Sequence, residues 1–443
     1  MRFSDLEGRR VGVWGLGREG RAVVRAVAER LPGTPLTLVD EGGAGGEGVL
    51  DDPAALLGCD VVVRSPGISR YRPEVARLAA AGVTLTTGTN LWFGEHPDAR
   101  AIGVTGTKGK STTSALIAHL AAAAGLRVRL GGNIGVPLVE LAGEDEADVD
   151  LWVLELSSFQ TSDLDASPPV GVLLNLHREH TDWHGTPERY REDKLALFAH
   201  RPGMTSVANA ADPGVRAVAA RLPNPRWFRS PEGFDAGPEG VTRAGRPLAP
   251  RAGIALMGEH NLDNVCAALA ALEAAGVPTD GLAGALATFR PLAHRLEPVA
   301  ERGGVLWVDD SIATIPEATV AAARALAPRP VVLLVGGRDR GQDYAPLAAY
   351  AAAGDAVAGI VGLPGNGARA LERVAAEPPA GRGGPVPVAM ADDLADAVAR
   401  AAAMAPAGGA VLLSPGAPTG DDFRDFAARG DAFAALVRGD PAG

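Results

Sequence analysis

Residues 101–124 contain the feature that most constrains the fold of this chain. An apolar stretch at 101–105 predicts a strand, and residues 111–124 predict a helix. Between them, residues 103–112 read G-V-T-G-T-K-G-K-S-T. Small residues in such a turn let backbone N–H groups close around phosphate oxygens at the start of the helix. The pattern predicts a phosphate-binding loop in an α/β sheet.

Within this loop, Lys110 would reach the terminal phosphates of a nucleotide, and the Ser111 hydroxyl could bind a metal ion. The general phosphate-loop pattern requires glycine five residues before Gly109, where this chain has Val104. A glycine turn formed by chance is the simple alternative, but strand, loop, lysine, hydroxyl and helix all agree. The other residues expected to contact ATP here are Gly106, Thr107, Lys108, Gly109 and Thr112.

Short apolar stretches alternate with helical ones along the chain, which predicts parallel sheets covered by helices on both faces. The expected strands are residues 10–14, 36–39, 59–64, 101–105, 151–156, 170–176, 305–308, 331–335, 358–361 and 411–413. A length of 443 residues suggests about two to four domains. We predict an α/β protein with a Rossmann-like domain over residues 1–92, a central P-loop-type ATPase domain over 93–297, and a Rossmann-like domain over 298–443.

Composition excludes several classes of partner. The formal net charge is −11, which argues against nucleic acid, because phosphate backbones recruit basic surfaces. No apolar stretch is long enough to span a bilayer, and the charged N-terminus is unlike a signal peptide. The two cysteines, Cys59 and Cys266, show no ligand spacing. We therefore expect a cytoplasmic protein with no membrane insertion.

A second glycine turn follows the first expected strand. Gly15, Gly17 and Gly20 form G-x-G-x-x-G, and Asp40 ends the next strand 20 residues later. This spacing is the dinucleotide-binding fingerprint, in which the acid binds a ribose hydroxyl. Considered alone, it predicts an NAD-dependent dehydrogenase. That alternative leaves the phosphate loop and Lys194 unexplained.

Motifs in a fixed order resemble the Mur ligase family along nearly the whole chain. They are residues 131–135 (G-G-N-I-G), 154–160 (L-E-L-S-S-F-Q), 175–182, 190–194 (Y-R-E-D-K), 258–264 (G-E-H-N-L-D-N), 294–297 (H-R-L-E), 310–311 and 414–415. Within the family, L-E-L-S-S-F-Q is typical of enzymes that add glutamate to UDP-N-acetylmuramoyl-L-alanine. The resemblance implies a monomeric, ADP-forming ligase of peptidoglycan synthesis whose substrates are that precursor, glutamate and ATP.

The resemblance also implies a mechanism and a catalytic set: Lys110, Glu155, His180 and Lys194. ATP would phosphorylate the alanine carboxylate, and the amine of glutamate would attack the acyl phosphate. Repulsion between carboxylate and triphosphate calls for Mg²⁺ and lysine. The expected Mg²⁺ ligands are Ser111, Glu155, His180 and, as a carbamate, Lys194. Further expected ATP contacts are Asn261, Asn264, Arg295 and Asp310.

In the same family the first glycine turn receives the UDP diphosphate instead of a dinucleotide. The expected precursor contacts are Leu16, Gly17, Arg18, Ser65, Pro66, Gly67, Ile68 and Asn133. A separate zinc interpretation arises from His177, His180, Asp182 and His184, whose spacing could be fitted to four ligands. No cysteine accompanies them, and the resemblance assigns only His180 to a metal. His177 and His184 are then loop histidines.

The departures from the family pattern cluster in the acceptor pocket. Residues 310–315 read D-S-I-A-T-I, so Ile312 replaces a lysine and Ile315 an asparagine. Arg340 stands where a lysine would hold glutamate, and arginine can bind a carboxylate through two parallel hydrogen bonds. This pattern resembles a subtype that adds L-glutamate, and neutral drift in a D-glutamate enzyme is the alternative. The expected glutamate contacts are Thr314, Arg340, Thr419 and Phe426.

Two other classes share parts of these features. A folylpolyglutamate-type ligase has the phosphate loop but gives no reason for the first glycine turn. A non-catalytic nucleotide-binding regulator would not need Lys110, Glu155, His180 and Lys194 together.

Overall fold

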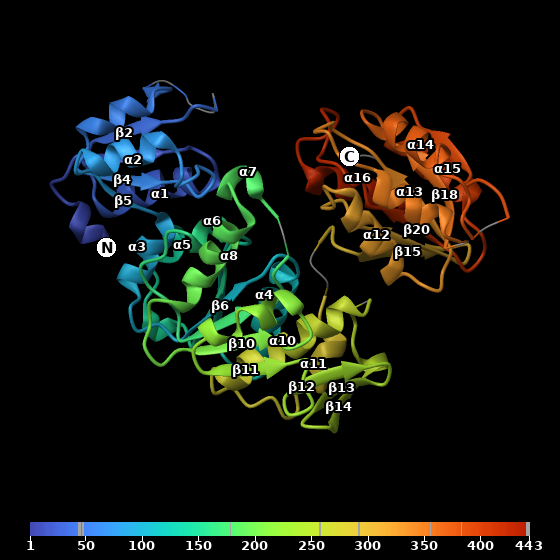
Figure 1. Ribbon diagram of the computed structural model, residues 1–443, viewed down its shortest axis with the longest axis horizontal. Coiled ribbons are helices and arrows are strands. Elements are labelled where there is room, and N and C mark those ends of the chain that lie inside the picture. The colour runs from blue at the N-terminus through green and yellow to red at the C-terminus, as the bar shows by residue number, and fades with distance from the viewer. Residues whose placement is uncertain are drawn as a thin grey trace. The chain divides into compact units, whose positions relative to one another are not determined.

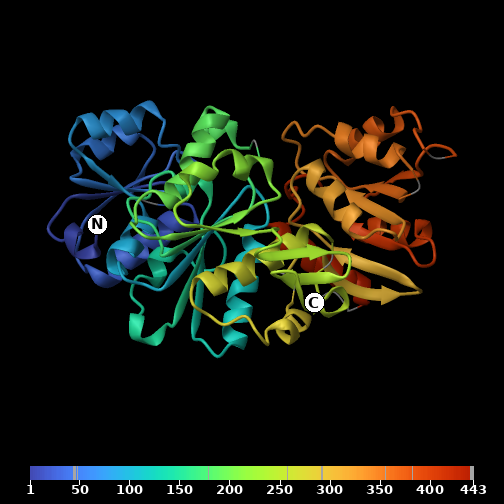
Figure 2. The same cartoon turned by 60° about the horizontal axis from the view of Figure 1, so that its bottom comes forward.

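The computed structural model describes residues 1–42, 46, 48–177, 179–256, 258–290, 293–354, 356–381 and 383–439. It divides into two compact units: unit 1 is Met1–Ile254 with His260–Phe289, and unit 2 is Ala255–Glu259 with Arg290–Gly443. Helices cover largely parallel sheets in both units (Figures 1 and 2), which confirms the α/β class. The boundaries of the three expected domains stay a prediction, because the first two fall within unit 1. No helix of the described residues is long and apolar enough to cross a membrane.

The first sheet of unit 1 has five parallel strands in the order β3-β2-β1-β4-β5. Successive side chains of a strand point to opposite faces, so Val11 and Val13 join one buried cluster and Trp14 joins another. The elements are β1 (Val11–Trp14), α1 (Arg18–Arg30), β2 (Leu36–Val39), β3 (Val49–Leu50), β4 (Val61–Arg64), α2 (Pro73–Ala80), β5 (Thr84–Thr86) and α3 (Gly88–Glu95).

The second sheet of unit 1 has six parallel strands in the order β11-β10-β9-β6-β8-β7. Its central strands β6, β8 and β9 are buried throughout, as expected of strands covered on both faces. The elements are β6 (Ala101–Thr105), α4 (Lys110–Ala123), β7 (Val128–Gly132), α5 (Leu138–Leu141), β8 (Leu151–Glu155), α6 (Ser158–Thr161), β9 (Val170–Leu173), α7 (Thr181–His184), α8 (Pro187–Leu195), β10 (Thr205–Asn209), α9 (Pro213–Ala217), β11 (Pro225–Phe228), α10 (His260–Ala274) and α11 (Ala283–Thr288).

A small antiparallel sheet follows β11 and was not predicted. Its strands are β12 (Phe234–Gly237), β13 (Gly240–Arg243) and β14 (Arg246–Pro250). The strands are short, and Arg, Thr, Asp, Gly and Pro make up most of them. They therefore lack the apolar alternation by which strands are recognised in a sequence.

Unit 2 contains one six-stranded sheet in the order β15-β16-β20-β17-β18-β19, in which only β15 runs antiparallel to its neighbour. Helices α12, α13 and α14 contribute to one buried cluster, and α15 and α16 to another. The elements are β15 (Glu297–Arg302), β16 (Val305–Asp309), α12 (Pro316–Ala325), β17 (Val331–Val335), α13 (Ala345–Ala352), β18 (Val357–Gly362), α14 (Gly367–Ala375), β19 (Val388–Met390), α15 (Leu394–Met404), β20 (Ala410–Leu413) and α16 (Phe426–Arg438).

The expected binding loops all follow the carboxyl ends of parallel strands. Such ends meet at one edge of a sheet, where ligands bind in open α/β folds. The loops are residues 15–18 after β1, 65–68 after β4, 106–109 after β6, 310–314 after β16, 336–340 after β17 and 414–419 after β20.

Candidate active site

The phosphate loop joins β6 to α4 at the carboxyl edge of the central sheet. Gly106 and Gly109 have positive φ values of 155° and 85°, which residues with a side chain seldom adopt. A Cβ atom on Gly109 would lie 2.5 Å from Oδ1 of Asn264. The two glycines allow a tight entry into the N-terminus of α4, where backbone N–H groups and the helix dipole favour phosphate.

Two lysines converge on one carbonyl of this loop. Lys110 Nζ donates to the carbonyl oxygens of Gly106 at 3.0 Å and Thr107 at 3.1 Å. Lys194 Nζ donates to the same Gly106 oxygen at 2.8 Å. Lys194 is 1% exposed, and burial, together with the charge of Lys110, lowers its pKa well below the ordinary value. The ammonium group of Lys110 favours the binding of negative charge at this point, whereas burial favours the uncharged amine of Lys194.

The chain has only three lysines among its 42 lysine and arginine residues. All three lie in this loop or contact it. Lys108 pairs with Glu179 through an Nζ–Oε1 contact of 2.5 Å, while Lys110 and Lys194 contact Gly106. Every other basic side chain is an arginine, which cannot lose its proton in a protein. The scarcity of lysine thus marks Lys194 independently of any motif. This signal was not used in predicting Lys194 from the sequence.

Glu155 ends strand β8, directly beside Val104 of β6. Its side chain is fully buried. Oε1 accepts a hydrogen bond from Asn133 Nδ2 at 2.6 Å, whereas Oε2 has no hydrogen-bond partner among the described residues. Leaving a buried acceptor unpaired costs about 1–3 kcal/mol, and more for a charged group. With the Ser111 hydroxyl in the first turn of α4, this oxygen offers the hard ligands that Mg²⁺ prefers.

His180 directly precedes α7 and has a positive φ of 52°, which is uncommon for a residue with a side chain. Its ring centroid lies 5.0 Å from that of Phe159. Burial is the main cause that lowers the pKa of His180. The charge of Glu179 opposes this change, and the charges of Lys194 and Lys110 reinforce it. The direction of this shift favours the neutral imidazole, the form in which histidine binds metal ions.

The histidines around His180 do not gather into a zinc site. Among the residues that the structure describes, only His294, Glu297 and Asp309 bring three potential ligand atoms within 4.8 Å of one another. There, His294 Nδ1 and Asp309 Oδ2 form a hydrogen bond of 2.7 Å. His177 is exposed and lies 3.7 Å from a single carboxylate. The zinc interpretation therefore has no support.

Two asparagines of α10 lie next to the phosphate loop. Asn264 Oδ1 accepts a hydrogen bond from Thr113 Oγ1 at 3.1 Å, and its Nδ2 donates to Asn261 Oδ1 at 2.8 Å. Both asparagines are buried. Asn264 thus joins α10 to α4 at the loop, and the expected contacts of both residues with ATP stay a prediction.

Arg295 and Asp310, also expected at the nucleotide, lie in unit 2. Asp310 accepts hydrogen bonds from Ser414 Oγ at 2.8 Å and from the Leu296 backbone N–H at 3.2 Å. Burial raises its pKa to about 7. Arg295 Nε is buried and has no hydrogen-bond partner within the described part of the chain. Such groups are often completed by a ligand.

Packing within the turn explains why residues 15–20 contain glycines. Asp40 Oδ1 accepts a hydrogen bond from the Leu16 backbone N–H at 2.9 Å, so the acid at the end of β2 helps to close the turn after β1. A Cβ atom on Gly20 would lie 1.8 Å from the Gly15 carbonyl oxygen. The dinucleotide fingerprint therefore has a structural cause here and does not require NAD.

The two loops expected to bind the precursor lie against each other. A Cβ atom on Gly15 would lie 2.9 Å from both Ser65 Cβ and Ile68 Cδ1. Ser65 donates its backbone N–H to the Trp14 carbonyl oxygen at 2.8 Å. The carboxyl ends of β1 and β4 thus bring Leu16 and Gly17 next to residues 65–68.

Arg18 connects this region to the central sheet. Its Nη2 donates to the carbonyl oxygens of Gly132 at 3.2 Å and Gly135 at 2.5 Å. These carbonyls flank Asn133, which binds Glu155. The structure therefore brings Arg18 and Asn133, both expected at the precursor, close to the carboxylate expected at the metal.

Several functional candidates in unit 1 were missed by sequence reasoning. Trp183, His184 and Asp193 link α7 and α8 to Ser69 and Tyr71 of the first sheet's loops. His184 is fully buried in α7 and is not the loop histidine that was expected. No motif marks these residues, because their roles depend on partners distant in sequence.

In unit 2, the loops with the expected glutamate contacts meet at one edge of the sheet. Arg338 donates its backbone N–H to the Pro418 carbonyl oxygen at 2.9 Å, and Ser311 Oγ donates to the Phe426 carbonyl oxygen at 2.8 Å. Arg340 is exposed. The contacts of glutamate with Thr314, Arg340, Thr419 and Phe426 stay a prediction.

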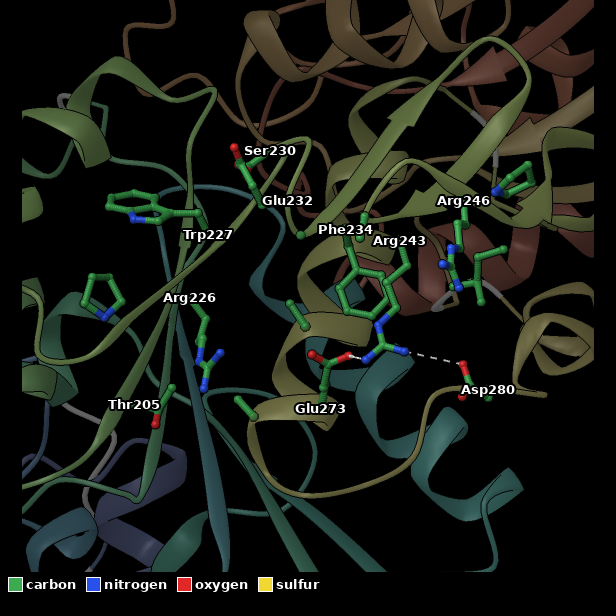
Figure 3. A pocket seen from close by; sticks show the side chains of 17 residues that line it. Thr205, Arg226, Trp227, Ser230, Glu232, Phe234, Arg243, Arg246, Glu273 and Asp280 are labelled. Atoms are coloured by element: carbon green, nitrogen blue, oxygen red, sulfur yellow. Dashed lines mark hydrogen bonds and ion pairs between the residues drawn. The ribbon is translucent and has the colours of Figure 1, made fainter.

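A hollow of about 860 Å³ lies elsewhere in unit 1, beside the small antiparallel sheet (Figure 3). Arg243 in its wall pairs with Glu273 at 2.7 Å and Asp280 at 3.5 Å, so this arginine is already neutralised. Along α10, Glu273 lies nine residues beyond Asn264, about 14 Å on an α-helix. The hollow is therefore separate from the phosphate loop.

Two family models match this chain, both beyond residue 103. The model described as "Mur ligase middle domain" matches residues 104–272, and "Mur ligase, glutamate ligase domain" matches residues 294–416. The class defined by these domains is the ATP-dependent ligases that form amide bonds.

Relatives match over the full length. The chain is 43% identical to the "UDP-N-acetylmuramoyl-L-alanine--L-glutamate ligase" of Xanthomonas campestris pv. campestris (strain 8004), covering 100% of this chain and 98% of that protein. It is 44% identical to the protein of the same name from a Micromonospora strain, covering 99% and 98%. The MurF ligase of Thermotoga maritima in complex with ADP shares the fold at a TM-score of 0.61 and 18% identity, covering 99% and 96%. The chain belongs to the Mur ligase family.

Proposed function

We propose that this ligase joins L-glutamate to UDP-N-acetylmuramoyl-L-alanine with conversion of ATP to ADP. The observation that carries the proposal is the match, at 43–44% identity over 99–100% of the chain, to proteins named for that reaction. The phosphate loop and the convergent lysines support a site for ATP, and the two loops after β1 and β4 support a site for the precursor. A dehydrogenase would leave these lysines without a role.

In the proposed mechanism, the terminal phosphoryl group of ATP passes to the alanine carboxylate of the precursor. The amine of glutamate then attacks the carbonyl carbon, the amide bond forms, a proton is released and phosphate leaves. Both donor and acceptor of the phosphoryl group are anionic, so their approach requires positive charge. We assign this charge to Lys110, and the hydrogen bonds of its Nζ to the Gly106 and Thr107 carbonyl oxygens of the phosphate loop support the assignment.

We assign the Mg²⁺ site to Ser111, Glu155, His180 and the carbamate of Lys194. The buried and unpartnered Oε2 of Glu155 supports this assignment, as does the neutral imidazole of His180. When bound, Mg²⁺ would neutralise charge on the phosphoryl oxygens. The protein residues hold that charge in a fixed place away from water.

Carbamylation of Lys194 would convert a buried cation into an anionic oxygen ligand. The amine nitrogen bonds to the carbon of CO₂ and a proton is released, which requires an uncharged amine. Burial of Lys194 favours that state. We expect Lys194→Arg, which cannot form a carbamate, to lower ADP formation at least about tenfold, since loss of even an outer-shell partner of a metal ligand costs about 10- to 100-fold.

The carbamate has a direct readout in ¹³C nuclear magnetic resonance after labelling with ¹³C-bicarbonate. The wild type and the matched Lys108→Arg variant should show the carbamate signal, and Lys194→Arg should lose it. A signal that persists in Lys194→Arg would contradict the assignment. The low lysine content leaves few other amines that could give the signal.

The preference for L-glutamate rests on the relatives' name and on the acceptor loops. Ile312 replaces a lysine and Arg340 replaces another, so the cations available to the two glutamate carboxylates differ from those of the D-glutamate pattern. The test supplies ATP, Mg²⁺ and UDP-N-acetylmuramoyl-L-alanine with either mirror form of glutamate. We expect ADP formation with L-glutamate to exceed that with D-glutamate at least about tenfold. Equal or reversed rates would refute the preference, and no ADP with either form would refute the proposed function.

A further inference from the structure

Helices α7 and α8 connect the two regions proposed to bind metal and precursor. Residue His180 directly precedes α7, and Lys194 lies in the last turn of α8. Both helices contact a short segment, residues 67–71, that continues the expected precursor loop after β4. The contacts are of two kinds. One is a polar chain that begins at the exposed Tyr71 and is buried from Asp193 to Ser158, and the other is a tryptophan contact.

The polar chain runs through Asp193, the residue before Lys194. Asp193 Oδ1 accepts a hydrogen bond from the Tyr71 hydroxyl at 2.8 Å. Oδ2 pairs with His184 Nδ1 at 2.5 Å, and His184 Nε2 pairs with Ser158 Oγ at 3.0 Å. Because a carboxylate can only accept, Nδ1 of His184 is the donor. Both oxygens of Asp193 are thus engaged, which fixes the turn of α8 that holds Lys194.

Ser158, His184 and Asp193 have the connectivity of a hydrolase triad, but their setting excludes that role. Ser158 is 3% exposed and His184 is 0% exposed, so no external acyl group can reach the hydroxyl. A fully satisfied buried network makes a part of the core rigid. Ser158 also lies three residues after Glu155. This series of hydrogen bonds therefore connects three places: the segment that follows Glu155, the helix that holds Lys194, and Tyr71.

The tryptophan contact joins residues 67–71 to the helix that follows His180. Trp183 Nε1 donates to the Gly67 carbonyl oxygen at 3.2 Å, and Ser69 Oγ donates to the Trp183 carbonyl oxygen at 2.7 Å. Trp183 is three residues beyond His180. Its ring centroid lies 6.1 Å from that of Tyr71, at an interplanar angle of 85°. These contacts join residues 67–71 directly to α7.

We propose that Tyr71 and Ser69 are positioning residues through which the occupied precursor loop sets the places of Lys194 and His180. The consequence is positive coupling, in which the precursor strengthens binding of the Mg²⁺–nucleotide complex. This inference rests on the proposed function, because it takes residues 65–68 as precursor contacts and Lys194 and His180 as metal ligands. Neither Tyr71 nor Ser69 touches the nucleotide loop in any contact of the described residues.

The test measures this coupling without turnover. Calorimetry gives the Kd of Mg²⁺–ADP for the full chain, with and without saturating UDP-N-acetylmuramoyl-L-alanine. We expect the precursor to tighten Mg²⁺–ADP binding at least about fivefold in the wild type. In Tyr71→Phe and Ser69→Ala the factor should fall below about twofold, while the Kd without precursor changes little. Reciprocity requires the same factor for the effect of Mg²⁺–ADP on precursor binding.

Tyr350→Phe is the matched control, because it removes the same hydroxyl group from a tyrosine of α13 in unit 2. It should keep the wild-type coupling factor. Tyr71→Phe leaves the ring in place, so thermal unfolding should change only slightly. A purely structural role would alter both Kd values equally and leave their ratio unchanged.

Two results would overturn the inference: a wild-type coupling factor in both Tyr71→Phe and Ser69→Ala, or no coupling in the wild type itself. Failure of the proposed function is recognised separately. In that case the same wild-type preparation forms no ADP from ATP, Mg²⁺, the precursor and L-glutamate.

Discussion

Burial sets the chemistry of single residues in this enzyme. Lys194, Glu155 and Asp310 are all ionisable side chains removed from water. Desolvation disfavours a charged form. Each of these residues must therefore have a hydrogen-bonding partner, change its protonation state or bind a ligand. Among single residues, we expect a change at Lys110 to have the strongest effect on ATP use.

Replacing Lys110 with alanine should abolish ATP-dependent phosphate release. The variant removes the ammonium group that lies over the loop carbonyls, and loss of one such electrostatic group costs about 100- to 1,000-fold in kcat. Phosphate release is measured with saturating precursor and glutamate, and circular dichroism confirms folding. Near-normal turnover in the folded variant would remove Lys110 from the mechanism.

Asp310 should make stability depend on pH. Burial raises its pKa to about 7 in the folded chain, above the ordinary value of 3.8. The stability that protonated Asp310 contributes is complete below about pH 4 and is lost as pH rises through about 7. Asp310→Asn removes this dependence.

We therefore compare the difference in Tm, Asp310→Asn minus wild type, at two pH values. We expect this difference to be larger at pH 8 than at pH 5. Thermal unfolding at both pH values measures it. A Tm difference that stays constant across this range would contradict the raised pKa. Because only the difference is compared, hydrogen bonds lost in the variant do not affect the sign.

The roles of individual residues were predictable only where a motif fixes them. Lys110 and Ser111 follow from a local pattern in which strand, loop and helix position the side chains. Asp193 and His184 could not be predicted, because their partners Tyr71 and Ser158 are distant in sequence and the contacts form only in the folded chain.

Elements were predicted well where apolar periodicity is strong. The strands expected at residues 101–105 and 331–335 correspond to β6 and β17. The helix expected at residues 111–124 corresponds to α4, which begins one residue earlier, at Lys110, because a glycine and a lysine at a helix start do not resemble a helix interior. The polar strands β12–β14 were missed.

The phosphate loop offers a matched test of element geometry. Gly109 and Gly125 have nearly equal φ values, 85° and 88°. A Cβ atom would collide with Asn264 at Gly109 but meet nothing within 4 Å at Gly125. Alanine at either position should cost about 1–2 kcal/mol of stability through backbone strain.

Only Gly109→Ala should also weaken ATP binding, by at least about tenfold, or about 1.4 kcal/mol. Its Cβ pushes α10 and the loop apart, whereas Gly125 lies beyond the far end of α4. Nucleotide titration and thermal unfolding of both variants give the comparison. Equal effects on ATP binding would show that the close approach to Asn264 is unimportant.

At the scale of the whole molecule, the expected binding residues are divided between two compact units. The phosphate loop and both precursor loops belong to unit 1, and the loops expected to hold glutamate belong to unit 2. Sequence patterning indicated the parallel sheets of both, but not that the first two expected domains share one compact unit. Contacts such as Gln160 Nε2 to Glu19 Oε1 at 2.8 Å create that continuity.

This division predicts separable kinetics for Arg340→Lys. Lysine cannot form the two parallel hydrogen bonds that arginine makes with a carboxylate, so the KM for L-glutamate should rise at least about tenfold. The KM for ATP should stay within about twofold. Arg329→Lys, before β17 at the opposite edge of the same sheet, is the control. Equal increases in both KM values would place Arg340 outside the acceptor pocket.

The scarcity of lysine gives this protein an unusual reactivity. Reagents that attack primary amines, such as aldehydes or activated esters, find side-chain targets only at Lys108, Lys110 and Lys194. Lys194 is shielded by burial and Lys108 is the most open of the three. We therefore expect labelling of the lysine side chains to change when a nucleotide is bound, and coupling of the enzyme to a support through these side chains to modify the loop expected to bind ATP.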